Sequence, residues 1–357
     1  MSGKKFKRDE GEGEGSDNNN NMSERERQAL EEIKRLDEIF RLWEIERGRK
    51  IIDFVKEKKE SGVTKLSIMH GEIGLEERKI FIFSYDDDYV HCYYEDTNTL
   101  ETLPSVHVRL RYFCPVKYTD GTILLINGLD RTTSIQVSPC MIFDGKGFDW
   151  VQSPLYYDDG TVKRFEHSGV TDSAAILLSN GLVLIAGGGP LGETWRECFF
   201  YLPKQKIFVV SNALLGIPRK KAAMSLFGVG KKAIICGGSS IGMTVSSTEI
   251  YDEDADSFSE GPQMAERRQG HTATLSRNNS VIVCGGQSNG ISLRSTEIYN
   301  PSENRFVKGP DMIDARVHHS ATILSDGRIL ICGGNANNRS EIYDPKTNSF
   351  SYGPPFI

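Results

Sequence analysis

The sequence predicts an all-β fold in which similar small sheets repeat along the chain. Three related segments, CGGSSIGMTVSSTEIYDEDADSFSEGP, CGGQSNGISLRSTEIYNPSENRFVKGP and CGGNANNRSEIYDPKTNSFSYGP, begin at Cys236, Cys284 and Cys332 and are therefore 48 residues apart. Repeats of this length are supersecondary units that bury their apolar faces against neighbouring copies. Each copy contains an apolar strand that ends in a glycine pair, then an alternating strand (TEIYD, TEIYN or SEIYD). Adjacent glycines favour tight turns that need a positive φ.

The same unit can be traced upstream in weaker copies, which gives six units over residues 62–357. Each unit has an aromatic or apolar pair spaced by seven residues that brackets a turn. The six pairs are Tyr93 with Leu100, Phe143 with Trp150, Tyr201 with Phe208, Tyr251 with Phe258, Tyr299 with Phe306, and Tyr343 with Phe350. Four short strands per unit, repeated radially, are typical of a β-propeller. We therefore predict a six-bladed β-propeller with an N-terminal α-helical extension.

The segment before the propeller divides into two parts. Residues 1–22 are acidic and Asn-rich with almost no apolar side chains, which predicts disorder. Residues 23–61 predict a charged amphipathic helix, because Ser23 and Glu26 match a capping box and apolar positions follow a 4-3-4-3 spacing. These positions are Ala29, Ile33, Leu36, Phe40 and Trp43. These apolar residues form a stripe along one side of the helix. The stripe fits either a helix docked on the same chain, which we slightly favour, or a coiled coil that would form a homodimer.

Composition excludes several classes of protein. The 357 residues carry a net charge of −6, whereas binding to nucleic acid or anionic membranes requires clustered cations. No apolar stretch approaches the ~20 residues of a membrane span, and the N-terminus has no secretory signal core. The seven cysteines lack CxxC spacing, which suits free thiols in a reducing compartment. We therefore expect a cytoplasmic protein with neither nucleic-acid nor membrane partners.

The last units resemble the kelch repeat family. The family pattern runs from an Arg through small or His residues to an apolar strand, a glycine pair, and a Tyr and an aromatic around a turn. RRQGHTATLSRNNSVIVCGG with STEIYNPSENRF and ARVHHSATILSDGRILICGG with SEIYDPKTNSF match it almost fully. The first two units depart most, because Ser84-Tyr85 and Asn127-Gly128 stand where a glycine pair is expected. The resemblance covers about the last five sixths of the chain and implies a kelch-type propeller, a fold that serves both enzymes and binding modules.

The resemblance also implies a candidate binding face. In kelch propellers the loop after the glycine pair and the loop that enters the first strand open on the same face. Counting back from the second glycine of the last three units gives Lys220, Arg268 and Arg316. The residues that we predict to bind a partner are Lys220, Arg268, Arg316, Arg219, Arg267, His318, Arg111, Ser239, Gln287, Asn289, Asn335 and Asn337. Such cationic and amide donors suit an acidic partner segment, whereas the alternative interpretation is that an Arg at a repeat position braces its own blade.

The histidines and cysteines of the repeats are interpreted as structural. His271 and His319 occupy equivalent places, where the preceding unit has Ala223, and a metal site would need further converging ligands. Cys284 and its two equivalents recur on separate units, as buried small residues do. Glu249, Glu297 and Glu341 recur in the third strands, which indicates a structural task such as bridging to a neighbour. We expect no metal, no cofactor and no catalytic residue.

Three functions remain open at this stage. The first is a non-enzymatic protein–protein interaction module, a scaffold or adaptor that binds a partner loop or peptide on one propeller face. Related proteins serve as substrate receptors of ubiquitin ligases, although no BTB or F-box domain is evident here. The second is a kelch-fold enzyme such as a sialic acid epimerase, which needs a base beside an Arg-lined pocket. The third is a cytoskeletal cross-linker.

Overall fold

The described part of the protein lies within one of its two units. The chain divides into Met1–Ile68 and Met69–Ile357. The computed structural model describes residues 79–83, 89–107, 110–111, 113–118, 122–126, 129–130, 140–143, 148–151, 155–156, 162–163, 171–190, 193–203, 206–228, 231–334 and 339–355. The predicted disordered tail and the predicted helix of residues 23–61 lie outside these residues. Within them, no helix is long and apolar enough to cross a membrane.

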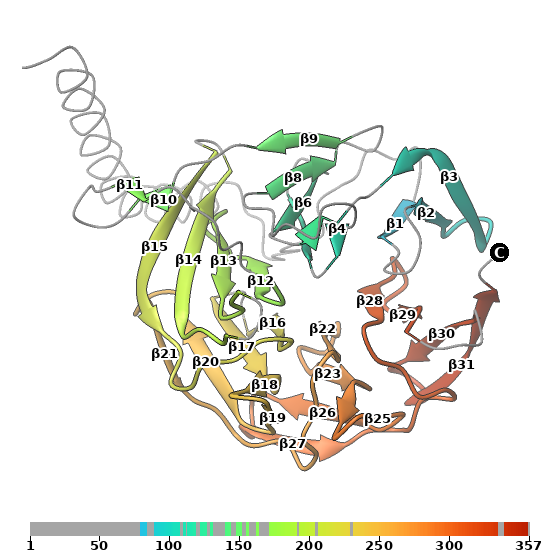
Figure 1. Cartoon of the computed structure of the whole chain (residues 1–357). Coiled ribbons are helices and arrows are strands. Elements are labelled where there is room, and N and C mark those ends of the chain that lie inside the picture. The colour runs from blue at the N-terminus through green and yellow to red at the C-terminus, as the bar shows by residue number, and fades with distance from the viewer. Residues whose placement is uncertain are drawn as a thin grey trace, which may run out of the picture. The chain divides into compact units, whose positions relative to one another are not determined.

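Five blades, which we label B to F, are arranged around a common centre (Figure 1). Each contains four antiparallel strands, and the sheet of blade C has two further strands. Blade B contains β5 (Cys114–Lys117), β6 (Ile123–Ile126), β8 (Cys140–Phe143) and β9 (Phe148–Val151). Blade C contains β12 (Ala174–Leu177), β13 (Val183–Ala186), β14 (Glu197–Leu202) and β15 (Ile207–Leu214). Blade D contains β16 (Ala223–Phe227), β17 (Lys232–Cys236), β20 (Thr248–Asp252) and β21 (Ser257–Glu260). Blade E contains β22 (Thr272–Leu275), β23 (Val281–Cys284), β26 (Thr296–Asn300) and β27 (Arg305–Lys308). Blade F contains β28 (Ser320–Ile323), β29 (Ile329–Cys332), β30 (Arg339–Asp344) and β31 (Ser349–Pro355).

The other strands form smaller sheets. Sheet A has three strands, β1 (Lys79–Phe83), β2 (Tyr89–Tyr94) and β3 (Thr99–His107). Two-residue strands form three hairpins or pairs, which are β4 (Leu110–Arg111) with β7 (Leu129–Asp130), β18 (Ser239–Ser240) with β19 (Met243–Thr244), and β24 (Gln287–Ser288) with β25 (Ile291–Ser292). In blade C, β10 (Leu155–Tyr156) and β11 (Val162–Lys163) extend the sheet beyond β15. The predicted propeller of four-stranded units is thus confirmed for the five blades.

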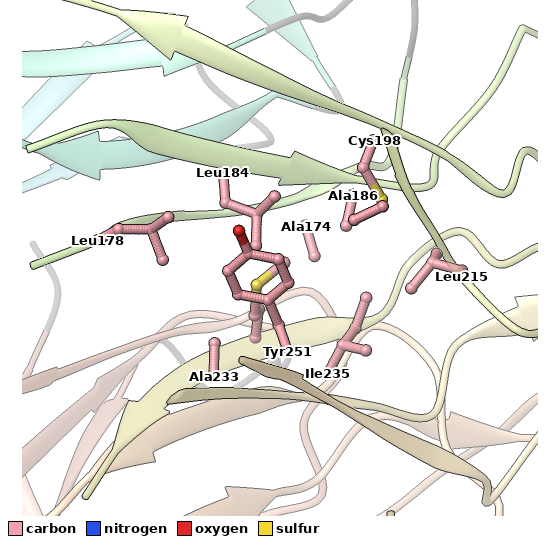
Figure 2. Close-up of a cluster of buried hydrophobic side chains, with 11 residues drawn as sticks. Ala174, Leu178, Leu184, Ala186, Cys198, Leu215, Ala233, Ile235 and Tyr251 are labelled. Atoms are coloured by element: carbon pink, nitrogen blue, oxygen red, sulfur yellow. The ribbon is translucent and has the colours of Figure 1, made fainter. Parts of the chain in front are cut away.

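The second strand of each blade is buried on both faces because each blade packs between two neighbours. All four residues of β13, β23 and β29 are buried, which explains why these strands read as continuous apolar runs. Figure 2 shows one such interface, where Leu184 of blade C lies above Ile235 and Tyr251 of blade D. Full burial of an aliphatic side chain of this size contributes about 1.5–3 kcal/mol.

Sheet A contacts both the first and the last blade. The Phe81 ring lies 5.0 Å from the Phe143 ring of blade B, edge to face. On the other side, one buried cluster joins sheet A to blade F and contains Tyr93, Leu324, Leu330, Cys332 and Ile342. In Figure 1 the last strand of blade F, β31, ends beside β3.

Equivalent hydrogen bonds join sheet A to blade F and blade D to blade C. The backbone N–H of Ser325 donates to Glu95 Oε2 at 2.9 Å. The Ser179 hydroxyl of blade C donates to Glu253 Oε2 at 2.8 Å, and the Ser179 N–H donates to the same oxygen. Each Glu comes two residues after the tyrosine of its strand (Tyr93 in β2 and Tyr251 in β20), so the contact recurs at the equivalent place of two repeats.

The predicted aromatic pairs are confirmed in four blades. Paired rings lie 4.9 to 5.2 Å apart for Tyr201 with Phe208, Tyr251 with Phe258, Tyr299 with Phe306, and Tyr343 with Phe350. Tyr93 also lies opposite Leu100 in the β2–β3 register. The prediction for blade B was wrong, because Phe148 lies opposite Phe143 whereas Trp150 lies opposite Met141. The turn in that blade is therefore shorter by two residues than in the other repeats.

Candidate functional site

The two loops expected on one face do lie side by side. In blade D, Lys220 pairs with Ser239 in an isolated β-bridge, and in blade E, Gln269 pairs with Gln287 in the same way. One partner precedes the first strand and the other follows the glycine pair. We call the surface formed by these two sets of loops in blades C to F the loop face.

Glycine is required where these loops touch. Gly238 has a φ of +100°, and a Cβ there would lie 2.6 Å from the Lys220 carbonyl oxygen. Gly286 has a φ of +90°, and its Cβ would lie 2.7 Å from the Gln269 carbonyl oxygen. Both the left-handed backbone and the close approach exclude a side chain.

A belt of backbone hydrogen bonds crosses the loop face from blade C to blade F. Lys221 N–H donates to Asp172 O at 2.8 Å, Gly270 N–H to Lys221 O at 2.9 Å, and His318 N–H to Gly270 O at 2.8 Å. All four residues have φ between +56° and +63°. Since the belt fixes the backbone of successive blades, side chains on it are presented by a rigid frame.

The three repeat arginines are buried, which corrects their prediction as partner-binding residues. Arg219, Arg268 and Arg316 are 1%, 0% and 0% exposed. Arg219 donates to the carbonyls of Gly237 and Ser247 at 2.9 and 3.0 Å, and Arg268 and Arg316 donate to the matching glycine carbonyls. Their guanidinium groups brace the blade from inside and cannot reach a partner.

Each buried arginine is paired with the glutamate of its third strand. Arg219 contacts Glu249 at 2.7 Å, and the other pairs are Arg268 with Glu297 at 3.1 Å and Arg316 with Glu341 at 2.9 Å. The expectation that these glutamates bridge to neighbouring segments is confirmed, because each also accepts two backbone N–H groups. The donors are Gly216 and Ile217 for Glu249, Ala265 and Glu266 for Glu297, and Ile313 and Asp314 for Glu341. A buried ion pair requires such additional hydrogen bonds.

Counting from the second glycine misaligned blade D by one residue. Ala223 lies opposite Cys236, and Thr272 lies opposite Cys284, so the first hairpin of blade D is one residue longer than that of blade E. Arg219, and not Lys220, therefore matches Arg268. Likewise Ala222, and not Ala223, matches His271, since a Cβ on the second glycine of each blade would meet these side chains.

The remaining predicted residues differ in accessibility. Arg267, His318 and Asn289 are exposed, Lys220 and Gln287 are half-buried, and Ser239 is buried at 7% exposure. The backbone of Arg111 lies in β4, whereas Asn335 and Asn337 lie outside the described residues. The structure thus leaves a mixed cationic and amide surface on blades D to F in place of a ring of arginines.

The two repeat histidines are enclosed between blades. Burial and the nearby Arg316 and His318 lower the pKa of His319 to about 3, and its Nε2 lies 3.0 Å from Thr272 Oγ1. Burial lowers the pKa of His271 well below its ordinary value, with Arg268 adding to the effect. Both rings are therefore neutral near pH 7. Across the described ranges, no group of three or more His, Cys, Asp or Glu side chains could hold a metal ion.

The repeat cysteines are also enclosed. Burial raises the pKa of Cys236, Cys284 and Cys332 to about 12, so all three are thiols at neutral pH. A thiol at that pKa is a weak nucleophile and a poor metal ligand.

The sequence analysis did not identify the apolar residues that are exposed on the loop face. Ile241 and Met243 of the β18–β19 hairpin are 78% and 64% exposed, and Ile291 of the β24–β25 hairpin is 70% exposed. The sequence indicates a turn in both segments, SSIGMT and QSNGIS. The feature that could have revealed the exposed side chains is an apolar residue directly beside the glycine of each turn.

The repeated blades around one centre define the class of the protein as a β-propeller. A family model described as a kelch motif matches residues 270–313, which run from the entry of blade E to the entry of blade F. The match covers one repeat of the chain, and the propeller arrangement of the blades is consistent with a kelch-type repeat. No curated protein matches the chain.

Proposed function

We propose that this protein is a non-enzymatic interaction module that binds an acidic segment of a partner protein on the loop face. A kelch propeller in general suggests a scaffold for protein interactions. The observation that carries the proposal is that some cationic side chains of these loops are buried and others are accessible. The repeat arginines are buried in the frame, whereas Arg267 is exposed and Lys220 and Lys221 are half-buried on the same face. Among the described residues, none of these three lies within ion-pair distance of a carboxylate, and Lys220 and Lys221 interact at longer range with Asp172, where they oppose the rise that burial causes in its pKa.

The frame also supports binding over catalysis. His271, His319 and the three repeat cysteines are buried and neutral, so none of these five groups is exposed to a substrate on the loop face. A general base needs a pKa near the working pH, which the pKa of about 3 for His319 does not provide. We also place the protein in the cytoplasm, as the scattered cysteines indicated.

We further propose that sheet A is the sixth blade and closes the ring. It lies against blade B through Phe81 and against blade F through Tyr93. The contact from Ser325 to Glu95 repeats the contact from Ser179 to Glu253 between consecutive blades. A closed ring removes exposed sheet edges and holds the loops in fixed relative positions.

The proposal is tested by reversing the accessible charges. The full chain with Lys220→Glu, Lys221→Glu and Arg267→Glu should capture its partners from the native host at least tenfold less well than the unaltered chain. The matched control reverses Lys231, Arg305 and Lys346, which lie at the turns at the other end of the strands, and should capture normally. Equal capture of the same partners by both variants would refute a partner site on the loop face.

A further inference from the structure

Two equivalent hairpins of the loop face carry large exposed apolar side chains. Met243 on β19 and Ile291 on β25 occupy the same place in blades D and E, directly after the turn glycine. They are 64% and 70% exposed, and Ile241 at the tip of the first hairpin is 78% exposed. Single exposed apolar residues are ordinary, but these recur at the same place in two adjacent blades.

Ile241 occupies a backbone conformation that is unfavourable for its side chain. Its φ is +47°, in the left-handed region, where a β-branched residue is rare and costs about 1–2 kcal/mol. The equivalent residue of blade E is Asn289, with a φ of +49°, which tolerates this conformation well. Packing offers no compensation, since the side chain of Ile241 lies largely in solvent. An unfavourable residue kept at an exposed tip indicates a task outside the fold.

Arg267 lies between the two hairpins. The N–H of the next residue, Arg268, donates to Val245 O just after β19, and Gln269 pairs with Gln287 at the start of β24. Arg267 is exposed, and no carboxylate in the described ranges pairs with it. A cation is therefore placed between two apolar tips on a protein of net charge −6.

From this arrangement we infer that the β18–β19 and β24–β25 hairpins bind a partner segment with bulky apolar side chains next to a carboxylate. The apolar side chains cover Ile241, Met243 and Ile291, and the carboxylate pairs with Arg267 as a bidentate hydrogen-bonded ion pair. The inference rests on the proposed function, because it assigns to the loop face the chemistry of its partner. It differs from a purely electrostatic face, which would need no apolar residue.

The test uses a displayed library of random twelve-residue peptides selected on the full chain. Enriched peptides should carry Leu, Phe, Trp or Ile within two residues of Asp or Glu. Their affinity, measured with the fluorescein-labelled peptides, should fall at least tenfold for the variant Ile241→Asn, Met243→Ser, Ile291→Ser, and also for Arg267→Gln. Ile241→Asn places the residue of blade E at the same turn, so this variant should fold at least as stably as the original.

The matched control is Leu214→Ser, which removes an apolar side chain that is 51% exposed at the end of β15, outside both hairpins. It should leave peptide affinity unchanged. Peptides that bind the hairpin variant as tightly as the unaltered chain would overturn the inference, and so would enrichment without acidic or apolar residues. If those peptides still lose affinity for the charge-reversed loop face, the proposed function stands while the hairpin site fails.

Discussion

At the scale of single residues, the repeat arginine belongs to the interior of the fold. Arg268 donates to Gly285 O, Ser295 O and Glu297, and it is fully buried. Blade C has no glutamate at the equivalent position of its third strand. In blade D, Glu249 lies opposite Ile235, whereas in blade C the residue opposite the equivalent Ile185 is Phe199. Phe199 is buried in the core between blades B and C. An apolar residue can therefore replace the glutamate within this same chain.

This comparison gives a prediction for the ion pair. Arg268→Met should lower the free energy of unfolding by about 3–5 kcal/mol, because Glu297 would remain buried without its partner. Adding Glu297→Leu should recover part of the loss, since no uncompensated charge is left. Urea denaturation of the two single variants and the double variant measures the coupling. Strictly additive losses would show that the pair does not act as a unit.

The sequence alone left the role of these arginines open. Their recurrence predicted a shared role but did not distinguish a side chain turned into the blade from one turned to solvent. The pattern that distinguishes them is the recurrence of Glu249, Glu297 and Glu341 in the same three blades, which supplies a buried carboxylate for each guanidinium. The exposed Arg267 has no counterpart in this pattern, and only the structure separates it from its neighbour Arg268.

At the scale of elements, strands and turns were predicted well because each has a local signal. Apolar runs marked the second strands, and the Tyr and Phe pairs marked the third and fourth. The tyrosine has a further reason to recur, since its hydroxyl donates to an Asn or Asp in the following turn. These bonds join Tyr93 to Asn98, Tyr251 to Asp256, Tyr299 to Asn304, and Tyr343 to Asn348. Blade B was misread because register depends on turn length, which the sequence spacing did not reveal.

The glycine pair gives a prediction at this scale. Gly286→Ala should lower Tm more than Gly290→Ala, although both glycines have a φ between +80° and +90°. A Cβ at Gly290 meets nothing within 4 Å, whereas one at Gly286 would press on the Gln269 carbonyl and separate the two loops. Thermal unfolding followed by circular dichroism compares the two variants. An equal change in Tm would mean that left-handed strain alone accounts for the glycine at this position.

At the scale of the whole molecule, the contacts between the first and the last units could not be predicted from the sequence. The first two units are weak copies, and the contacts that join sheet A to blade F connect residues more than two hundred positions apart, such as Ser325 and Glu95. Local periodicity carries no information about such pairs. The structure supplies them, and they repeat contacts found between consecutive blades.

The central claim is that a closed ring of blades holds the loop face in place, and hydrogen exchange tests it most directly. Tyr93→Ala removes the ring that sheet A contributes to the cluster with Leu324, Leu330 and Ile342. Exchange should then rise in β28 to β30 as well as in β2, while β17 and β20 stay protected. Tyr251→Ala, the matched change between blades C and D, should instead raise exchange in those two blades. Unchanged exchange throughout blade F in Tyr93→Ala would contradict the closed ring.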